Sequence, residues 1–224
     1  MQLAIFDLDN TLLAGDSDYL WGQFLVDQGL VDGDWYEREN RRFYEQYKAG
    51  TLDIYEFCAF SLKPLTAHEP QLLYQWRQDF VRERIEPIVA AGTPTLLEKH
   101  RAQGDQLLII TATNRFITEP IAELLGIDEL IATDPEMQDG RYTGRVAGLP
   151  SFQNGKVQRF KQWLEQQPQK FTRTIFYSDS RNDLPLLLLA DQAVAVDPDE
   201  VLRAEAMQRG WPVISLRSEP LRIT

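Results

Sequence analysis

The chain begins with an apolar run that ends in two carboxylates, LAIFDLDNTLL at residues 3–13. Four consecutive apolar residues, 3–6, are typical of a strand that is buried on both faces of a sheet. Asp7 and Asp9 follow at once, and then come the turn formers Asn and Thr. Because ligands bind beyond the carboxyl ends of strands in open parallel sheets, this stretch predicts a central strand that leads into a functional site.

Two carboxylates at this spacing repel each other unless a positive charge lies beside them, and a divalent cation is the usual partner. A purely structural interpretation is also open, in which Asp7 and Asp9 only end the strand in an Asx turn. A single D-x-D pair does not decide between the two interpretations, because so short a motif also arises by chance.

Composition restricts the class of protein. The 224 residues, 43% hydrophobic and 25% charged, suit one α/β domain with a large insertion or two small domains. A single cysteine, Cys58, excludes an internal disulfide framework. The net charge of −11 opposes binding to nucleic acid or to anionic membranes. With no signal-peptide pattern and no apolar run long enough to span a bilayer, we expect a cytoplasmic protein.

Residues 14–86 show helical patterns and no strand pattern, with Gly and Pro as breaks between the segments. Helices are predicted at residues 18–29, 34–49, 53–61 and 68–84. Alternation of strands and helices resumes at residue 87. The sequence therefore predicts a catalytic core of residues 1–13 and 87–224, with a helical cap, residues 14–86, inserted after the first strand.

Beyond residue 87 apolar strand patterns and helical patterns alternate. The predicted strands are 107–110, 129–132, 174–177, 193–196 and 213–216, and the predicted helices are 93–103, 116–125, 155–166, 184–190 and 199–209. An Asp-Gly turn at 139–140 suggests an additional edge hairpin over 140–147. This order predicts an α/β fold with a Rossmann-like, mostly parallel sheet that is covered by helices on both faces.

Polar residues follow three of the predicted strands, and a lysine opens one of the predicted helices. These residues are Asp7 and Asp9, Thr111 and Thr113, Asp179 and Asp183, and Lys156. In combination they suit phosphoryl transfer. One carboxylate can attack phosphorus, a second can protonate the leaving alcohol, and a hard cation held by oxygens can offset the repulsion between anions. A hydroxyl and a lysine can hold the phosphate oxygens.

These residues form four ordered motifs: DLDNT at 7–11, IIT at 109–111, GK at 155–156, and SD with a further Asp at 178–183. Together they resemble the haloacid dehalogenase-like superfamily of aspartyl-phosphate phosphotransferases. The resemblance covers nearly the whole chain. It implies a Mg²⁺-dependent phosphomonoester hydrolase that works through an aspartyl-phosphate intermediate on a small phosphorylated metabolite.

The resemblance also implies roles for individual residues. Asp7 would be the nucleophile and Asp9 the general acid and base. Thr111, Ala112 and Lys156 would bind phosphate, and Mg²⁺ would be held by Asp7, Asp9 through its backbone carbonyl, Asp179 and Asp183.

The helical insertion resembles the cap of the phosphoserine phosphatase-like branch. The loops ITATN at 110–114 and SDSRNDLPL at 178–186 look most like bacterial histidinol-phosphate phosphatases. Phosphoserine phosphatases usually carry a cap arginine and a Ser-Gly-Gly second motif, whereas this chain has Lys48 and Thr-Ala-Thr. We therefore expect histidinol phosphate or another amino-alcohol phosphate rather than phosphoserine.

Asp16, Asp18 and Asn114 are candidates for substrate specificity, each with a structural alternative. Asp16 and Asp18 either contact a positively charged part of the substrate or cap the helix that follows. Asn114 either touches the substrate or caps a helix. Trp21 could face an imidazole or ammonium group, although core packing is the usual role of such an aromatic side chain. His100 is expected at the surface.

Other functions remain open at this stage. Phosphoserine phosphatase is one alternative, and a phosphoaspartate switch protein is another, although Asp9 should activate water and so remove the phosphoryl group that a switch must keep. A haloalkanoate dehalogenase would need no metal and would lack Asp9.

Overall fold

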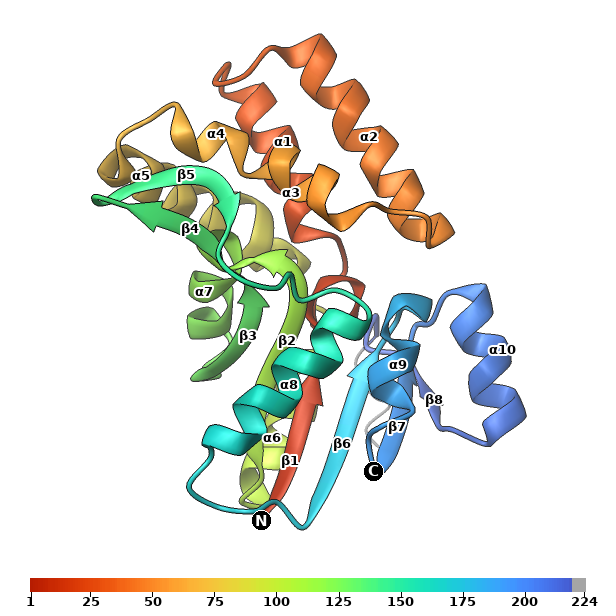
Figure 1. Cartoon of the computed structure of the whole chain (residues 1–224). Helices are drawn as coiled ribbons and strands as arrows, with labels where there is room; N and C mark the ends of the chain where they lie inside the picture. The colour runs from red at the N-terminus through yellow and green to blue at the C-terminus, as the bar shows by residue number, and fades with distance from the viewer. Residues whose placement is uncertain (219–224) are drawn as a thin grey trace.

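The computed structural model describes residues 1–218 and contains one six-stranded, all-parallel sheet with helices on both faces (Figure 1). Across the sheet the strands are β3 (Glu129–Thr133), β2 (Gln106–Asn114), β1 (Gln2–Phe6), β6 (Arg173–Ser178), β7 (Gln192–Val196) and β8 (Val213–Ile214). β1 lies in the middle, where Ile5 is paired with Leu108 of β2 and Phe176 of β6. The predicted Rossmann-like class is confirmed.

Alternate residues of the strands face the helices that cover the two sides of the sheet. Phe6 belongs to the core that includes α6 (Thr93–Ala102) and α7 (Arg115–Leu124). Ile5 belongs to a second core on the other face, which is closed by α8 (Asn154–Gln166), α9 (Leu184–Leu187) and α10 (Glu200–Arg209). Both faces of β1 are therefore buried, as its continuous apolar sequence requires.

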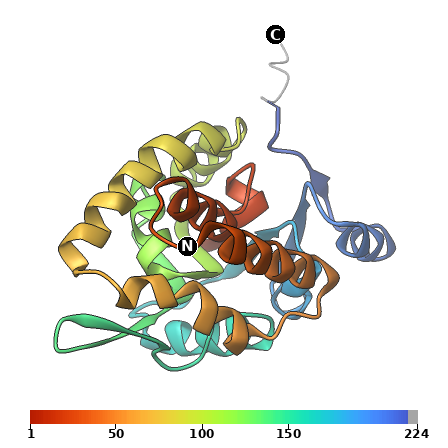
Figure 2. The same ribbon diagram turned by 90° about the horizontal axis from the view of Figure 1, so that it is seen from above.

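A group of helices lies above the carboxyl ends of the strands (Figures 1 and 2). They are α1 (Ser17–Asp27), α2 (Gly33–Ala49), α3 (Ile54–Ser61), α4 (Lys63–Thr66) and α5 (Pro70–Phe80), followed by short turns over Val81–Ile85 and Glu86–Ile88. We call them the helical layer. Residues 14–86 contain no strand.

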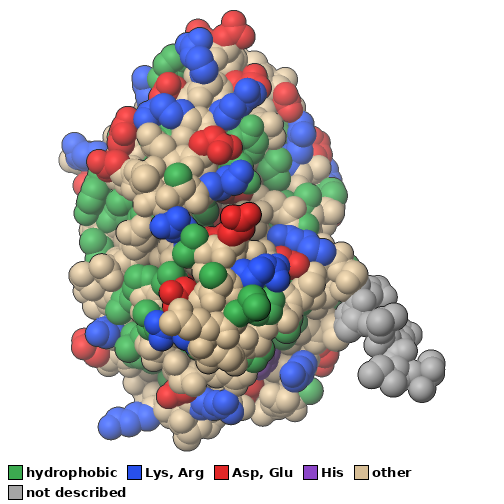
Figure 3. Space-filling view, turned by 90° about the vertical axis from the view of Figure 1, so that its right-hand side faces the viewer, with side chains coloured by type: hydrophobic (Ala, Val, Ile, Leu, Met, Phe, Trp, Pro, Cys, Tyr) green, Lys and Arg blue, Asp and Glu red, His purple; other side chains and the backbone are tan. Residues whose placement is uncertain are grey.

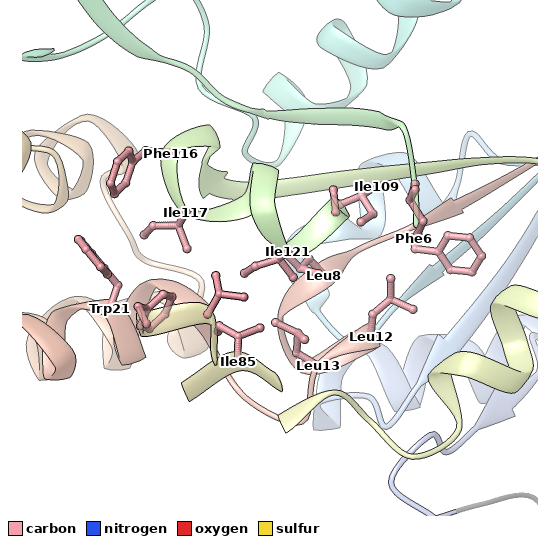
Figure 4. Packing of buried hydrophobic residues seen from close by; sticks show 14 of the residues in the cluster. Phe6, Leu8, Leu12, Leu13, Trp21, Ile85, Ile109, Phe116, Ile117 and Ile121 are labelled. Atoms are coloured by element: carbon pink, nitrogen blue, oxygen red, sulfur yellow. The ribbon is translucent and has the colours of Figure 1, made fainter. Parts of the chain in front are cut away.

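The helical layer shares one hydrophobic core with the sheet. Trp21 of α1 is 1% exposed and packs against Phe24, Phe80 and Phe116, the last of which belongs to α7 (Figure 4). Side chains from the turn after β1 continue the core from this cluster toward Phe6 (Figure 4). Trp21 therefore serves packing, the usual role of such a side chain.

The two ends of the helical layer meet at the core. Leu13 and Val89 form an antiparallel bridge. The amide of Ala14 donates to the carbonyl of Ile88 at 2.6 Å, and the amide of Ala90 donates to the carbonyl of Leu12 at 3.0 Å. The segment thus leaves and re-enters the core where two stretches of chain are hydrogen-bonded to each other.

The predicted hairpin forms, but it does not extend the main sheet. β4 (Pro135–Gln138) and β5 (Arg141–Val146) make a separate two-stranded sheet that lies against α3 and α4 (Figure 1). Tyr142 of β5 adds contacts with α7 and α5, since its ring packs edge-on against Phe116 and its hydroxyl lies 3.4 Å from that of Tyr74. The hairpin thus packs on helices and not on the edge of the main sheet.

His100 is buried, which contradicts the expectation that it lies at the surface. It is 2% exposed, with Nδ1 2.7 Å from Asp105 and Nε2 2.9 Å from the hydroxyl of Tyr177. Both ring nitrogens therefore have polar partners inside the protein, and one of these partners, Tyr177, is 77 residues away in sequence.

The surface in Figure 3 shows Lys and Arg side chains interspersed with Asp and Glu. None of the helices within residues 1–218 is long and apolar enough to cross a membrane. Residues 219–224, the last of the predicted core, lie outside the described part of the chain.

Candidate active site

The end of β1 places two carboxylates at the upper edge of the sheet. Asp7 is still extended, and its amide donates to the carbonyl of Tyr177 in β6 at 2.9 Å. The chain then makes a tight turn over Leu8–Leu12, in which Asn10 has a φ of +57°. Asparagine tolerates this left-handed conformation better than most residues. The turn keeps Asp9 buried at the same edge, 8% exposed.

Lys156 joins the ends of two strands. Its ammonium donates to Oδ1 of Asp7 and to Oδ1 of Asp183, each at 2.7 Å. All three side chains are buried. The hydroxyl of Ser178 donates to the other oxygen of Asp183 at 2.6 Å. A lysine at the start of α8 and two aspartates that are 176 residues apart in sequence thus form one charged cluster.

Thr11 links Asp7 with a third carboxylate, that of Asp179. Its hydroxyl oxygen lies 3.3 Å from Asp7 Oδ2 and 3.3 Å from Asp179 Oδ1, and it accepts the amide of Asp179 at 3.0 Å. The carboxylates of Asp7 and Asp179 therefore both contact the hydroxyl of Thr11.

Burial and mutual repulsion shift the pKa values of the groups in this cluster. Burial, followed by the charge of Asp183, raises the pKa of Asp7 to about 7, although the attraction of Lys156 opposes the shift. Burial and the charge of Asp7 raise the pKa of Asp179 well above its ordinary value. Burial works against the charge of Lys156, but Asp183 and Asp7 outweigh it, so its pKa is raised and the lysine stays charged.

Asp9 has different partners. Its Oδ1 accepts the backbone amide of Ser17 at 2.6 Å, and its Oδ2 accepts the hydroxyl of Thr113 at 2.8 Å. Burial, followed by the charge of Asp16, raises the pKa of Asp9 to about 6, while the two hydrogen bonds oppose the shift. A carboxyl group with such a pKa can exchange a proton near neutral pH.

The donors at this edge suit a hard cation. Within residues 1–218, no three His, Cys, Asp or Glu side chains are arranged to hold a metal ion by themselves. Mg²⁺ does not need such a set, because it binds through one or two carboxylates and keeps several water molecules. Asp7, Asp179 and Asp183 carry more negative charge than Lys156 balances, so the cluster fits an additional divalent cation.

A pocket opens above the carboxylates and extends into the helical layer. Its wall comes from both parts of the chain: Asp7, Asp9, Asp16, Asp18, Tyr19, Asn40, Phe43, Tyr44, Tyr47, Leu52, Ile54, Phe57, Thr111, Ala112 and Thr113. The sheet contributes the polar floor, and the helical layer contributes aromatic and aliphatic walls. Asp16 and Asp18 are acidic side chains at the helical side.

These two aspartates differ in their hydrogen bonds. Oδ1 of Asp16 accepts the amide of Tyr19 at 2.9 Å and so caps α1. Within the described residues no donor bonds to the carboxylate of Asp18, although that residue is only 8% exposed. Burial, with the charges of Asp16 and Asp9, raises the pKa of Asp18 well above its usual range. An unpartnered carboxylate in a pocket wall is a favourable place for a cationic group.

The structure brings most predicted site residues together, with Asn114 as the exception. Thr111 and Ala112 line the pocket floor beside the aspartates. Asn114 is 4% exposed, accepts the amide of Ile117 at 3.3 Å, and is absent from the pocket wall. Its side chain caps α7, which is the structural alternative that the sequence left open.

Tyr47 lines the pocket but was not predicted from the sequence. It lines the pocket from α2, and its carbonyl accepts the side-chain amide of Asn182 at 3.1 Å. Burial and the charges of Asp7 and Asp179 raise the pKa of its hydroxyl well above the ordinary value. The local sequence identifies an aromatic residue in a helix, but its position opposite β1 depends on how the helical layer sits on the sheet.

Comparisons with known proteins agree with this arrangement. The model of the haloacid dehalogenase-like hydrolase family matches residues 4–188. A histidinol-phosphatase of Neisseria meningitidis is 44% identical over 219 residues, covering 96% of this chain and 99% of that protein. A protein of unknown function from Bordetella pertussis, whose crystal structure is known, is also 44% identical, with a TM-score of 0.90, covering 96% of this chain and 98% of that one.

A more distant structure, a phospho-aspartyl intermediate analogue of phosphoserine phosphatase, has a TM-score of 0.67 at 18% identity and covers 98% of this chain and 95% of that one. At that identity the similarity concerns the fold alone. The chain therefore belongs to the haloacid dehalogenase-like hydrolase family and, as its four motifs predict, is an enzyme of the phosphatase branch.

Proposed function

We propose that the enzyme is a Mg²⁺-dependent phosphomonoesterase that forms an aspartyl-phosphate on Asp7 and acts on an amino-alcohol phosphate, such as histidinol phosphate. The observation that carries the proposal is the buried cluster of Asp7, Lys156 and Asp183, in which Asp7 lines a pocket that also contains an unpartnered carboxylate, Asp18.

Asp7 supplies the nucleophile. Its carboxylate oxygen attacks phosphorus, the bond to the substrate oxygen breaks, and the phosphoryl group is transferred to Asp7. Asp9 gives a proton to the departing alkoxide and then takes one from the water that attacks the aspartyl-phosphate. Division of one displacement into two steps and proton transfer by a carboxyl with a pKa of about 6 both lower the barrier.

The surroundings of Asp7 serve to hold the phosphoryl group. Lys156 and the hydroxyl of Thr111 bind its oxygens, with Ala112 in the same wall. Mg²⁺ would be held by Asp7, Asp179, Asp183 and the carbonyl of Asp9, and it would offset the repulsion between the phosphate and these carboxylates. Asp7, Asp9 and Thr111 are buried, which strengthens each electrostatic interaction at the site.

Substrate selection is assigned to the helical side of the pocket. No donor within residues 1–218 bonds to the carboxylate of Asp18, so an ammonium group of the substrate would supply the hydrogen bonds and the positive charge that this carboxylate lacks. The same carboxylate would repel the free carboxylate of phosphoserine. Phe43 and Phe57 offer an apolar wall for a ring or an aliphatic chain. The name of the Neisseria relative, histidinol-phosphatase, supports the same substrate class.

The experiment is a set of turnover measurements on the purified protein. Release of phosphate from p-nitrophenyl phosphate is measured with Mg²⁺ and with a chelator, and then kcat/KM is compared for histidinol phosphate, other amino-alcohol phosphates and phosphoserine. We expect metal-dependent turnover and a preference for the amino-alcohol phosphates. A phosphoaspartate that accumulates without turnover would contradict the proposal, and so would a preference for phosphoserine.

A further inference from the structure

Arg217 is a residue outside all four motifs that reaches the active-site loop from the far end of the chain. Its Nη1 donates to the carbonyl of Leu13 at 2.8 Å, and its Nη2 donates to the carbonyl of Asn10 at 2.7 Å. The two acceptors lie on the turn that follows Asp9 and leads into the helical layer. One guanidinium therefore bridges two carbonyls that are three residues apart in sequence and more than 200 residues away from it.

A third carbonyl of this turn, that of Leu12, is held by hydrogen bonds from the core. The carbonyl of Leu12 accepts the amide of Ala90 at 3.0 Å and the hydroxyl of Thr93 at 2.7 Å. Hydrogen bonds from the core thus hold the turn at Leu12, and Arg217 holds it on either side. Asn10, one of its two acceptors, is the residue in the left-handed conformation.

The segment that carries Arg217 is itself fixed to the core. Leu216 is 5% exposed, its amide donates to Asp197 at 2.9 Å, and its carbonyl accepts the amide of Gly92 at 2.9 Å. A Cβ atom at Gly92 would lie 3.0 Å from the Leu216 side chain and 3.2 Å from its Cα, so the contact is close. Asp197 also lies 3.6 Å from Nε of Arg217 and orients the guanidinium.

We propose that Arg217 is a positioning residue: its guanidinium fixes the turn after β1, and thereby the geometry of Asp9 and of the junction with the helical layer. The inference rests on the proposed function for the roles of Asp7 and Asp9. The planar fork of an arginine fixes the separation of two acceptors, which a lysine cannot do because its ammonium is a point charge on a flexible stem. The expected defect is therefore one of geometry rather than of charge.

The test compares Arg217→Gln, Arg217→Lys and Arg217→Ala with a matched control, Arg209→Gln. Arg209 lies on α10, pairs with Glu205 of the same helix at 2.8 Å, and has a side chain that is 43% exposed. We expect each Arg217 variant to lower kcat on p-nitrophenyl phosphate by about 10- to 100-fold, the scale of a small misplacement of catalytic groups. KM should change much less, and Arg209→Gln should match the wild type.

Two readouts separate positioning from mere stabilisation. Hydrogen exchange should accelerate at residues 10–15 and 88–90 of the Arg217 variants, with the strands of the sheet unchanged. Arg217 lines a cleft together with Asn10 and Asp179, so a small cation can reach its place from solvent. Methylguanidinium, at concentrations far below those that denature, should restore part of the kcat of Arg217→Ala, and methylammonium should not.

Three results would overturn the inference: kcat equal to that of Arg209→Gln, exchange that rises throughout the sheet, or full activity of Arg217→Lys. If Arg217→Ala does not fold, Arg217→Lys and Arg217→Gln are judged by the same exchange and kcat criteria. Failure of the proposed function is distinct, because a wild type without phosphatase activity would refute that proposal while the exchange at residues 10–15 still decides this one.

Discussion

Nζ of Lys156 lies 2.7 Å from Oδ1 of Asp7. The proposed nucleophile is therefore in direct contact with the buried ammonium group of a lysine in α8. This contact lowers the pKa of Asp7 against the effect of burial and favours the ionised form, which attacks phosphorus.

Substitution of Asp7 by Asn should abolish turnover while the fold persists. The amide keeps the shape of the side chain but cannot attack phosphorus, so kcat should fall by about 10⁴-fold or more. Phosphate release and the melting temperature are measured together, with the exposed Asp53→Asn as the control. A folded Asp7→Asn protein with a tenth of the wild-type activity would refute the nucleophile assignment.

Substitution of Asp9 by Asn should affect poor leaving groups most. Nitrophenolate departs without a proton, whereas an alkoxide requires one, so the loss of kcat should be greater for an alkyl phosphate than for p-nitrophenyl phosphate. Thr113 and the Ser17 amide would still contact the side chain, so its position should be retained. Equal losses on both substrates would show that Asp9 has a different role.

The metal-free protein should lose stability as the pH rises from about 4 to about 7. Asp7, with its pKa raised from 3.8 to about 7, and Asp9, raised to about 6, hold more protons when folded than when unfolded, so the free energy of unfolding falls with pH over this interval. Mg²⁺ needs the deprotonated carboxylates, so the increase in melting temperature that it causes should be larger at about pH 8 than at about pH 5.

Thermal unfolding with Mg²⁺ or with a chelator at both pH values measures this effect. Asp179→Asn should reduce the Mg²⁺-dependent increase, and Asp53→Asn should leave it intact. An increase that is the same or larger at the acidic pH would contradict the assignment of these carboxylates to the metal.

Substitution of Asp18 by Asn should narrow the preference for amino-alcohol phosphates over phosphoserine. A carboxylate and an ammonium a few ångströms apart interact by about 1–4 kcal/mol at intermediate dielectric, so a change of about tenfold in the ratio of kcat/KM values is expected. Asp16→Asn should change the ratio less, because Asp16 is engaged in capping α1 and Asn caps equally well. An unchanged ratio in Asp18→Asn would remove Asp18 from substrate recognition.

The proposed cap, residues 14–86, should become protected when the phosphoryl site is filled. Tyr47 and Asn182 already connect α2 to the loop after β6, and closure over a ligand would shield that contact from water. A metal fluoride that mimics phosphate should slow hydrogen exchange across this span, with fluoride alone as the control. Equal exchange in both samples would indicate that the helical layer does not move on binding.

Much of the fold could be predicted from the sequence because its signals are local. Continuous apolar runs identify β1 and β6, and turn residues mark the ends of α2 and α6. The predicted strand over 213–216 shows where such signals end, since the structure has only Val213–Ile214 in the sheet. Leu216 is apolar because it packs against Gly92, a tertiary contact that resembles a strand pattern in the sequence.

The candidate site was predictable as far as its motifs extend. Lys156 and Asp183 were expected near Asp7 because the four motifs follow one another in the order found in the family that the chain resembles. In the structure Lys156 contacts both aspartates. Asn114 was ambiguous, since an amide at the start of a helix can cap it or face a ligand, and only the three-dimensional position distinguishes these roles. Tyr47 was not predicted at all, because its place opposite the sheet depends on the docking of two parts of the chain.

The register of β1 determines when the site can first exist during synthesis. Phe6, the residue before Asp7, is paired with Ile109 on one side and with Tyr177 on the other. The residues of β2 and β6 that pair with β1 therefore leave the ribosome about 100 and 170 residues after β1 itself. Contacts of such sequence separation form slowly, because a long loop must close before they are gained. Until β6 has emerged, one edge of β1 is unpaired, and an unpaired apolar strand is prone to aggregation.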